Sequence, residues 1–128
     1  MSQIPGLYIE NSGNKGRSVL TALDIPEGST VEVCPVLVIP EKEVDIIHKT
    51  TLHDYYFRWG EKLDQAAIAL GFGSIYNHSN SPNTKIILDI PSRHIIIEST
   101  RFILAGEELT FNYIDDEQSK DQLWFNVK

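Results

Sequence analysis

Apolar and polar residues alternate along most of this chain in short runs that turn residues separate. Such runs predict β-strands, because successive side chains of a strand face opposite sides of a sheet. The segment Pro91-Ser92-Arg93 between two β-branched runs predicts a hairpin. The expected strands cover residues 7–10, 18–23, 85–90, 94–99, 101–104 and 109–113. The pattern is therefore that of a mostly β protein.

Two prolines mark the part of the chain where the pattern changes. Residues 30–39 alternate at first and then become continuously apolar. Pro35 and Pro40 lack a backbone N–H, which predicts that this segment lies near a sheet edge or breaks into two pieces. Residues 41–49 predict a helix, because acidic residues occupy its first turn and apolar residues recur on one face. Residues 54–59 return to a strand-like aromatic pattern.

Size and charge limit the classes of protein to consider. With 128 residues, the chain is expected to form a single domain over residues 1–128. A formal net charge of −7 disfavours nonspecific binding to nucleic acid, and no apolar run is long enough to span a membrane. Cys34 is the one cysteine, so it can form no internal disulfide and is expected to be a small buried residue. An intracellular location, cytoplasmic or nuclear, is the simpler expectation.

Two polar motifs carry most of the functional information. Residues 77–83 read Asn-His-Ser-Asn-Ser-Pro-Asn, and residues 106–113 read Gly-Glu-Glu-Leu-Thr-Phe-Asn-Tyr. The first lies between apolar runs, so it forms either an exposed loop or a buried polar knot whose side chains are all satisfied. Together the two motifs resemble the signature segments of SET-domain protein-lysine methyltransferases.

The resemblance extends over nearly the whole chain. Residues 13–19, Gly-Asn-Lys-Gly-Arg-Ser-Val, resemble the amino-terminal glycine loop of the family, and Ile25-Pro-Glu-Gly28 resembles the turn after it. Residues 54–57 and 69–76 resemble the small free-standing SET proteins of viruses and bacteria. The resemblance implies a β-clip type of SET fold, made of several small sheets and few short helices. In this fold the carboxy-terminal segment threads the Asn-His-Ser loop as a pseudoknot.

The implied activity is S-adenosylmethionine-dependent protein-lysine N-methylation, with S-adenosylhomocysteine as the product. Such an enzyme must hold a lysine amine, whose ordinary pKa is about 10.4, in its neutral form inside an aromatic channel. Tyr113 matches the catalytic tyrosine that closes the second motif, and Tyr55 matches a tyrosine that lines the channel. Without the resemblance, both would be interpreted as half-buried packing residues.

Matching positions also imply a cofactor site. Asn77 would hold the methionine portion through its side chain and His78 largely through its backbone, because an amino acid zwitterion needs both donors and acceptors. Trp124 would stack on the adenine or would simply cap the core. The cofactor-binding residues implied by the resemblance are Lys15, Gly16, Arg17, Asn77, His78 and Trp124.

The substrate channel has one further candidate. Phe111 lies two residues before Tyr113, so on a strand both side chains share a face, and Phe111 borders the channel or belongs to the core. In the family, a phenylalanine at the matching position leaves room for two or three methyl groups. The expected substrate is a lysine of a protein or peptide, either a histone or another basic protein.

Departures from the family pattern leave alternatives open. Asn80 stands where the motif often has Cys, and Ser18 where a second Gly is usual. No cysteine-rich segment follows Tyr113, so neither the zinc site of many eukaryotic members nor another metal site is expected. The channel wall must then come from Trp124 and Phe125 or from a second subunit, which leaves a homodimer open. The alternative function is a noncatalytic SET domain that binds a peptide or a partner.

Overall fold

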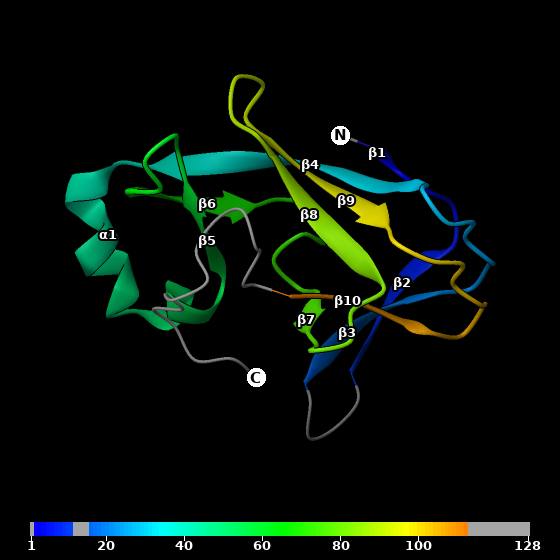
Figure 1. Cartoon of the computed structure of the whole chain (residues 1–128). Coiled ribbons are helices and arrows are strands. Elements are labelled where there is room, and N and C mark those ends of the chain that lie inside the picture. Colours follow the sequence, from blue (N-terminus) through cyan, green and yellow to red (C-terminus); the bar gives the residue numbers. More distant parts are fainter. Residues whose placement is uncertain (1, 12–15, 113–128) are drawn as a thin grey trace.

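The computed structural model describes residues 2–11 and 16–112. Within these ranges, two sheets and a short α-helix surround a shared apolar core (Figure 1). This arrangement confirms the mostly β fold with few short helices. The elements are β1 (Ser2–Gln3), β2 (Leu7–Asn11), β3 (Arg17–Thr21), β4 (Thr30–Ile39), α1 (Glu41–His48), the 3-10 helix η2 (Thr51–Asp54), β5 (Tyr56–Trp59), β6 (Gln65–Ala69), β7 (Asn77–His78), β8 (Thr84–Asp89), β9 (His94–Ser99) and β10 (Glu108–Phe111).

The larger sheet has six strands in the order β5-β6-β4-β9-β8, with β1 paired to β4 beside this row. Strands β8 and β9 form the predicted hairpin, in a register that pairs Asp89 with His94. Ile95 and Ile97 of β9 are fully buried, whereas Ile96 between them is partly exposed on the other face. The hairpin is therefore confirmed, and buried and partly exposed residues alternate along β9 as strand geometry requires.

Strand β4 runs unbroken through Pro35 in the middle of the sheet, so the expectation of an edge position or a break was wrong. The proline fits because β4 changes partner at this point. Along one edge, β4 pairs with β1 at Glu32–Val33 and then with β6 from Val36 onward. The Pro35 carbonyl accepts a 2.9 Å hydrogen bond from Leu70 N on that edge, so its missing N–H faces the gap between β1 and β6.

The region after β4 agrees with the expectation only in part. The predicted helix is confirmed as α1, which starts directly after Pro40 and has Glu41 and Glu43 in its first turn. The aromatic segment does not become a strand at once, because the Thr50 hydroxyl caps η2 by accepting a hydrogen bond from Leu52 N at 3.2 Å. Strand β5 therefore begins two residues later than expected.

The smaller sheet has the order β2-β3-β10-β7. Strand β10 pairs antiparallel with β3 and parallel with β7, which joins three segments that are far apart in the sequence. The strand expected over residues 101–104 does not form, and this segment contributes only an isolated antiparallel bridge between Ile103 and Ile25. This sheet brings both functional motifs to one place.

Apolar side chains from both sheets fill one core. Cys34 is fully buried there, as expected. Other members with almost no exposed surface are Val19, Ile25, Val31, Trp59, Ala67, Tyr76, Ile95, Ile97, Ile103, Leu109 and Phe111. Within the described residues, no helix is long and apolar enough to cross a bilayer.

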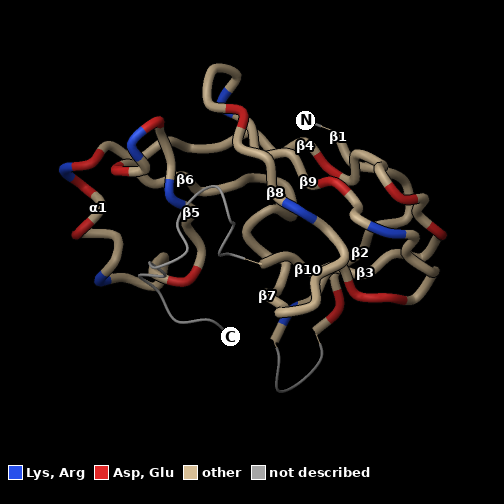
Figure 2. Tube along the Cα trace, viewed as in Figure 1, with Lys and Arg blue, Asp and Glu red and all other residues tan. Residues whose placement is uncertain are grey.

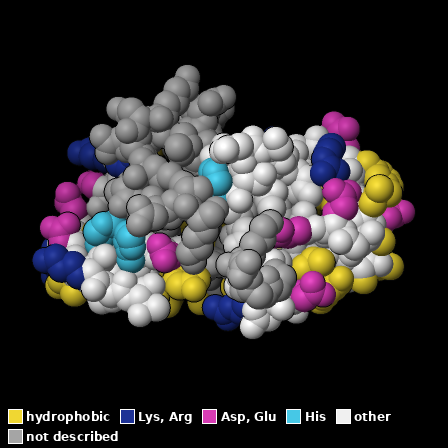
Figure 3. All heavy atoms as spheres, turned by 90° about the horizontal axis from the view of Figure 1, so that it is seen from below, with side chains coloured by type: hydrophobic (Ala, Val, Ile, Leu, Met, Phe, Trp, Pro, Cys, Tyr) yellow, Lys and Arg dark blue, Asp and Glu magenta, His cyan; other side chains and the backbone are white. Residues whose placement is uncertain are grey.

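The surface is mixed in charge, with acidic and basic residues interspersed along the trace (Figure 2). Hydrophobic side chains gather with acidic ones at the end of the molecule far from α1 (Figure 3). Leu23, Phe102 and Leu104 are 54%, 49% and 58% exposed beside the Ile25–Ile103 bridge.

Candidate active site

The two polar motifs meet where β10 lies beside β7, a contact that we call the crossing, formed by β10 and residues 77–84. The register pairs Thr110 with Asn77 and Phe111 with His78, and Ser79 N donates to Phe111 O at 2.9 Å. Because β10 lies between β3 and β7, the first motif and residues Val19 and Leu20 of β3 share β10 as a neighbouring strand. The crossing is the described part of the expected pseudoknot.

Asn83 holds the crossing together with its side chain. It is 3% exposed, its Nδ2 donates to Glu108 O at 2.9 Å, and its Oδ1 accepts from Thr110 N at 2.9 Å. The Thr84 hydroxyl also donates to Thr110 O at 2.8 Å. One amide side chain thus takes the place of a strand partner for β10. The sequence motif contained Asn83, but sequence reasoning gave it no role.

Asn77 connects the motif to the glycine segment. Its Nδ2 donates to Arg17 O at 3.0 Å and to Glu108 Oε2 at 2.8 Å, with a longer contact to Ser18 Oγ at 3.4 Å. All three partners are acceptors, so they fix the orientation of the amide. Among the described residues, none donates a hydrogen bond to Asn77 Oδ1, which therefore keeps its acceptor capacity for a ligand.

Gly16 and His78 flank this amide. Gly16 adopts a φ of +75°, a left-handed conformation that favours glycine, and an added Cβ there would meet no atom within 4 Å. The space beside the backbone is thus open to a ligand. The His78 Nε2 donates to Asn80 Oδ1 at 3.2 Å, so the imidazole points into its own loop while its backbone pairs with Phe111. This geometry suits a backbone role for His78.

Phe111 is fully buried at the end of β10. Its ring lies 5.8 Å from that of Phe57 and 5.6 Å from that of Tyr76, measured between centroids. Tyr55 is partly exposed, and its carbonyl accepts a 2.9 Å hydrogen bond from the Ser74 hydroxyl, just ahead of the first motif. Tyr55 lies two residues before Phe57, whose ring contacts that of Phe111.

Three of the expected site residues lie outside the described residues: Tyr113, Lys15 and Trp124. The structure does bring together Gly16, Arg17, Asn77, His78 and Phe111.

A buried carboxyl group lies beneath the crossing, and sequence reasoning missed it. Glu32 is fully buried in β4, where Oε1 accepts from the Tyr76 hydroxyl at 2.7 Å. Its Oε2 accepts from Phe72 N and from Gln3 Nε2, both at 2.9 Å. The available signal was that Glu32 is the one charged residue in the otherwise apolar run of residues 31–39. The three donors satisfy a group that would otherwise be costly to bury.

This carboxyl group affects its two titratable neighbours. Burial, reinforced by the charge and hydrogen bond of Glu32, raises the pKa of Tyr76 well above its usual range. Burial and the same carboxyl group also raise the pKa of the Cys34 thiol. Both groups therefore stay protonated, and the Tyr76 ring is held by its hydroxyl against Phe111.

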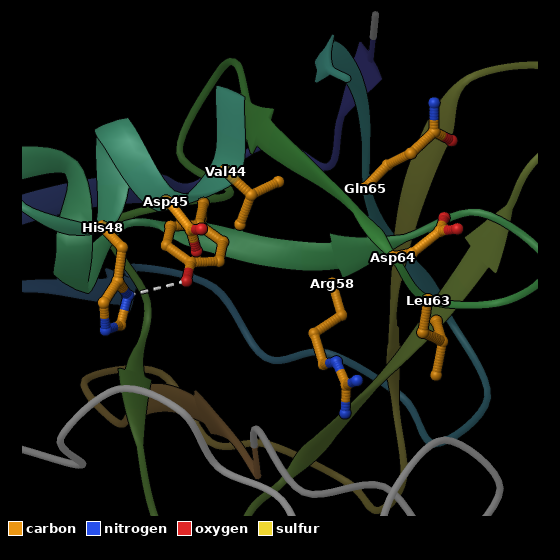
Figure 4. A pocket seen from close by; sticks show the side chains of 8 residues that line it. Val44, Asp45, His48, Arg58, Leu63, Asp64 and Gln65 are labelled. Carbon is orange, nitrogen blue, oxygen red and sulfur yellow. Dashed lines mark hydrogen bonds between the residues drawn. The ribbon is translucent and has the colours of Figure 1, made fainter. Parts of the chain in front are cut away.

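A cavity of about 250 Å³ lies between α1 and the β5–β6 strands (Figure 4). Tyr56 and Arg58 line it, and a 2.8 Å hydrogen bond joins the Tyr56 hydroxyl to His48 Nδ1. Phe57, between them on β5, contacts Phe111 instead. Since alternate residues of a strand face opposite sides, this cavity lies on the far side of β5 from the crossing.

Comparison with known proteins decides the family. The SET domain model matches residues 16–114. The chain belongs to the SET-domain family. A histone-lysine N-methyltransferase of Schizosaccharomyces pombe, specific for H3 lysine-37, is 32% identical over 120 residues, which cover 93% of this chain and 76% of that protein. The N-lysine methyltransferase KMT5A-B of Xenopus laevis is 29% identical over 128 residues, covering 89% of this chain and 38% of that protein.

Solved structures agree on the fold. A Plasmodium falciparum protein assigned as a histone methyltransferase has a TM-score of 0.69 at 24% identity, covering 93% of this chain and 100% of that one. CpSET8 of Cryptosporidium has the same TM-score and identity, covering 88% of this chain and 59% of that one. The expectation of a SET-type protein-lysine methyltransferase is thereby confirmed.

Proposed function

We propose that this SET domain uses S-adenosylmethionine to methylate a lysine amine of a basic protein and binds the cofactor against Gly16, Arg17, Asn77 and His78. The observation that carries the proposal is the Asn77 amide. Its donor side is engaged by Arg17 O and Glu108 Oε2, so its Oδ1 acceptor is oriented for a ligand ammonium group. The open space beside Gly16 suits a ligand that approaches the backbone closely.

The cofactor supplies an activated methyl group when bound, and the protein must supply position and a neutral amine. We assign Tyr113 the role of orienting the lysine amine through its hydroxyl, and Tyr55 the role of lining the lysine channel. Aromatic walls exclude water and so favour the uncharged amine, which is the nucleophilic form. The assignment of Tyr113 rests on the second motif, whose last described residue is Asn112.

For the remaining cofactor contacts, Lys15 and Trp124, the proposal rests on sequence matches alone. Among the described residues, no three His, Cys, Asp or Glu side chains lie together as metal ligands, and the chemistry assigned to the tyrosines needs none. Lysine methylation by the fission yeast and frog relatives supports a histone or another basic protein as substrate. The net charge of −7 would attract such a protein.

The cofactor assignment is tested by calorimetry with S-adenosylhomocysteine. The wild-type protein should bind it, and Asn77→Ala should weaken binding by roughly 1 to 3 kcal/mol, because a satisfied polar contact is lost. Asn80→Ala, in the same loop, is the matched control and should bind like wild type. If folded wild type takes up neither S-adenosylhomocysteine nor S-adenosylmethionine, the noncatalytic binding module replaces the enzyme.

The catalytic assignment is tested with Tyr113→Phe. This variant keeps the ring, so the melting temperature should hardly change, whereas methyl transfer to a histone peptide should fall by about ten-fold or more. Tyr8→Phe, on the exposed side of β2, is the matched control. Full activity in Tyr113→Phe would remove the tyrosine from the reaction.

The number of methyl groups depends on Phe111. Its full burial between Phe57 and Tyr76 fits a core residue, and its place on β10 two residues before Tyr113 fits a channel wall. We expect wild type to form di- or trimethyllysine and Phe111→Tyr to shift the products toward monomethyllysine, because the added hydroxyl takes up room and binds the amine or a water. Mass spectrometry of a peptide after a long reaction decides this, and unchanged products would make Phe111 a core residue only.

A further inference from the structure

Strand β8 ends the six-stranded sheet, and within the described residues no strand pairs with its outer side. Its backbone groups alternate in direction. Thr100 N donates to Asn83 O at 2.9 Å, which extends the β8–β9 ladder by one hydrogen-bonded pair. Counting in twos from Asn83, the odd-numbered residues of β8 bond to β9.

The other side of β9 gives the same answer. Ser99 N donates to Ser29 O at 2.9 Å, so the odd-numbered residues of β9 direct their backbone groups toward β4 and the even-numbered ones toward β8. Ile86 and Leu88 therefore direct their backbone N–H and C=O groups outward from the sheet. An apolar edge strand with free backbone groups is a template for pairing with another strand.

The sequence of β8 is complementary to itself. When two copies run antiparallel with Ile87 opposite Ile87, Lys85 lies opposite Asp89 of the second copy, and Ile86 lies opposite Leu88. The two-fold axis gives the Lys85–Asp89 pair twice, and both copies join opposite charges. Figure 2 shows basic and acidic stretches toward opposite ends of β8. The outward groups of Ile86 and Leu88 are the ones that would bond in this register.

The outer face of the sheet carries a row of apolar residues that ends at Ile87. Ile87 is 38% exposed and pairs in register with Ile96, which pairs in turn with Val33. A copy joined at Ile87 would continue this apolar row from one sheet into the next. Lys85 is held on this face by an ion pair with Glu98 at 3.2 Å, with its side chain 54% exposed.

We propose that two copies of this chain associate through β8 in an antiparallel two-fold contact centred on Ile87, which joins their six-stranded sheets into one continuous sheet. The occupant of the edge is a second copy because opposite charges meet only when the strand runs against itself in this register.

Charge reversal tests the contact by sedimentation or light scattering across a concentration series. Lys85→Asp alone brings two pairs of acidic residues together, and Asp89→Lys alone brings two pairs of lysines together, so each variant should weaken the dimer by about ten-fold or more. An equimolar mixture of the two variants should dimerise again, because each strand then meets its opposite charge. Glu98→Gln, which removes only the ion pair within one chain, should leave the dimer intact.

A cross-link tests the register. Ile87→Cys would face its own copy at a non-hydrogen-bonded position, where Cα atoms are about 4.5 Å apart and a disulfide can form. Mild oxidation should give a covalent dimer for Ile87→Cys and none for Lys85→Cys, and buried Cys34 is shielded in both. A monomeric wild type at millimolar concentration would overturn the proposal. A wild-type dimer whose variants neither recover on mixing nor cross-link at residue 87 would overturn it equally, because its contact would lie elsewhere.

Discussion

The two sheets of this SET domain are held together in different ways. In the six-stranded sheet, backbone ladders supply the hydrogen bonds and apolar side chains such as Ile95 and Ile97 fill the core. At the crossing, side chains replace backbone partners. The Asn83 amide bonds Glu108 O and Thr110 N of β10, and the Asn77 amide bridges β3 and β10. The first kind of structure tolerates any apolar residue of suitable volume, whereas the second depends on particular amide groups.

Asn83→Leu should break the crossing with the largest effect. Leucine has a similar size but bonds neither Thr110 N nor Glu108 O, and each group left without a partner costs about 1 to 3 kcal/mol. We expect urea unfolding to show a loss of about 2 to 4 kcal/mol, and cofactor binding should fall with it. Asn80→Leu in the same loop is the control and should change stability by less than about 0.5 kcal/mol. Equal effects of the two changes would mean that packing alone holds the crossing.

This contrast also explains what could be predicted from the sequence. A turn segment between two β-branched runs has a local physical cause, so the hairpin of β8 and β9 was predictable. The prediction from Pro35 was wrong. A proline is accommodated inside β4 because the partner strand on one side changes there from β1 to β6. The sequence of β4 does not show where β1 and β6 end.

The candidate site likewise contains residues that the sequence predicted and residues whose roles it did not predict. The resemblance identified the motif around Asn77 and His78, and the structure brings both residues to the crossing with Gly16 and Phe111. The roles of Asn83 and Glu32 could not be predicted, because each depends on partners 25 or more residues away in the sequence. A polar residue in an apolar strand signals a buried partner but does not identify it.

Tyr76→Phe tests a buried polar contact of the six-stranded sheet, the hydrogen bond from the Tyr76 hydroxyl to Glu32 of β4. The change keeps the ring against Phe111 but removes the donor to Glu32, and hydrogen bonds to charged groups contribute about 1.5 to 3 kcal/mol. Denaturant unfolding should show a loss in that range, against almost none for the exposed Tyr8→Phe. An unchanged stability would mean that Gln3 and Phe72 satisfy Glu32 without the tyrosine.

Ile97→Val tests the tolerance of the apolar sheet. One buried methylene is removed at a fully buried position, which typically costs about 0.5 to 1.5 kcal/mol. Ile87→Val on the outer face of the same sheet is the matched control and should cost less. If Ile97→Val proved as costly as Asn83→Leu, the contrast between the two sheets would not hold.

The smallest expected effect is a fall in stability at alkaline pH, produced by the thiol beside Glu32. Burial raises the pKa of Cys34 in the folded state, so the folded protein keeps the proton while the unfolded chain releases it. The stabilisation is fully present below the unfolded pKa and decreases as pH rises through it toward the higher folded value. With an unfolded thiol pKa of about 8.5, linkage predicts a loss of about 0.8 kcal/mol near pH 9. Urea unfolding of wild type and Cys34→Ala between neutral pH and this value measures the difference, and parallel pH profiles for the two proteins would show that the thiol does not contribute.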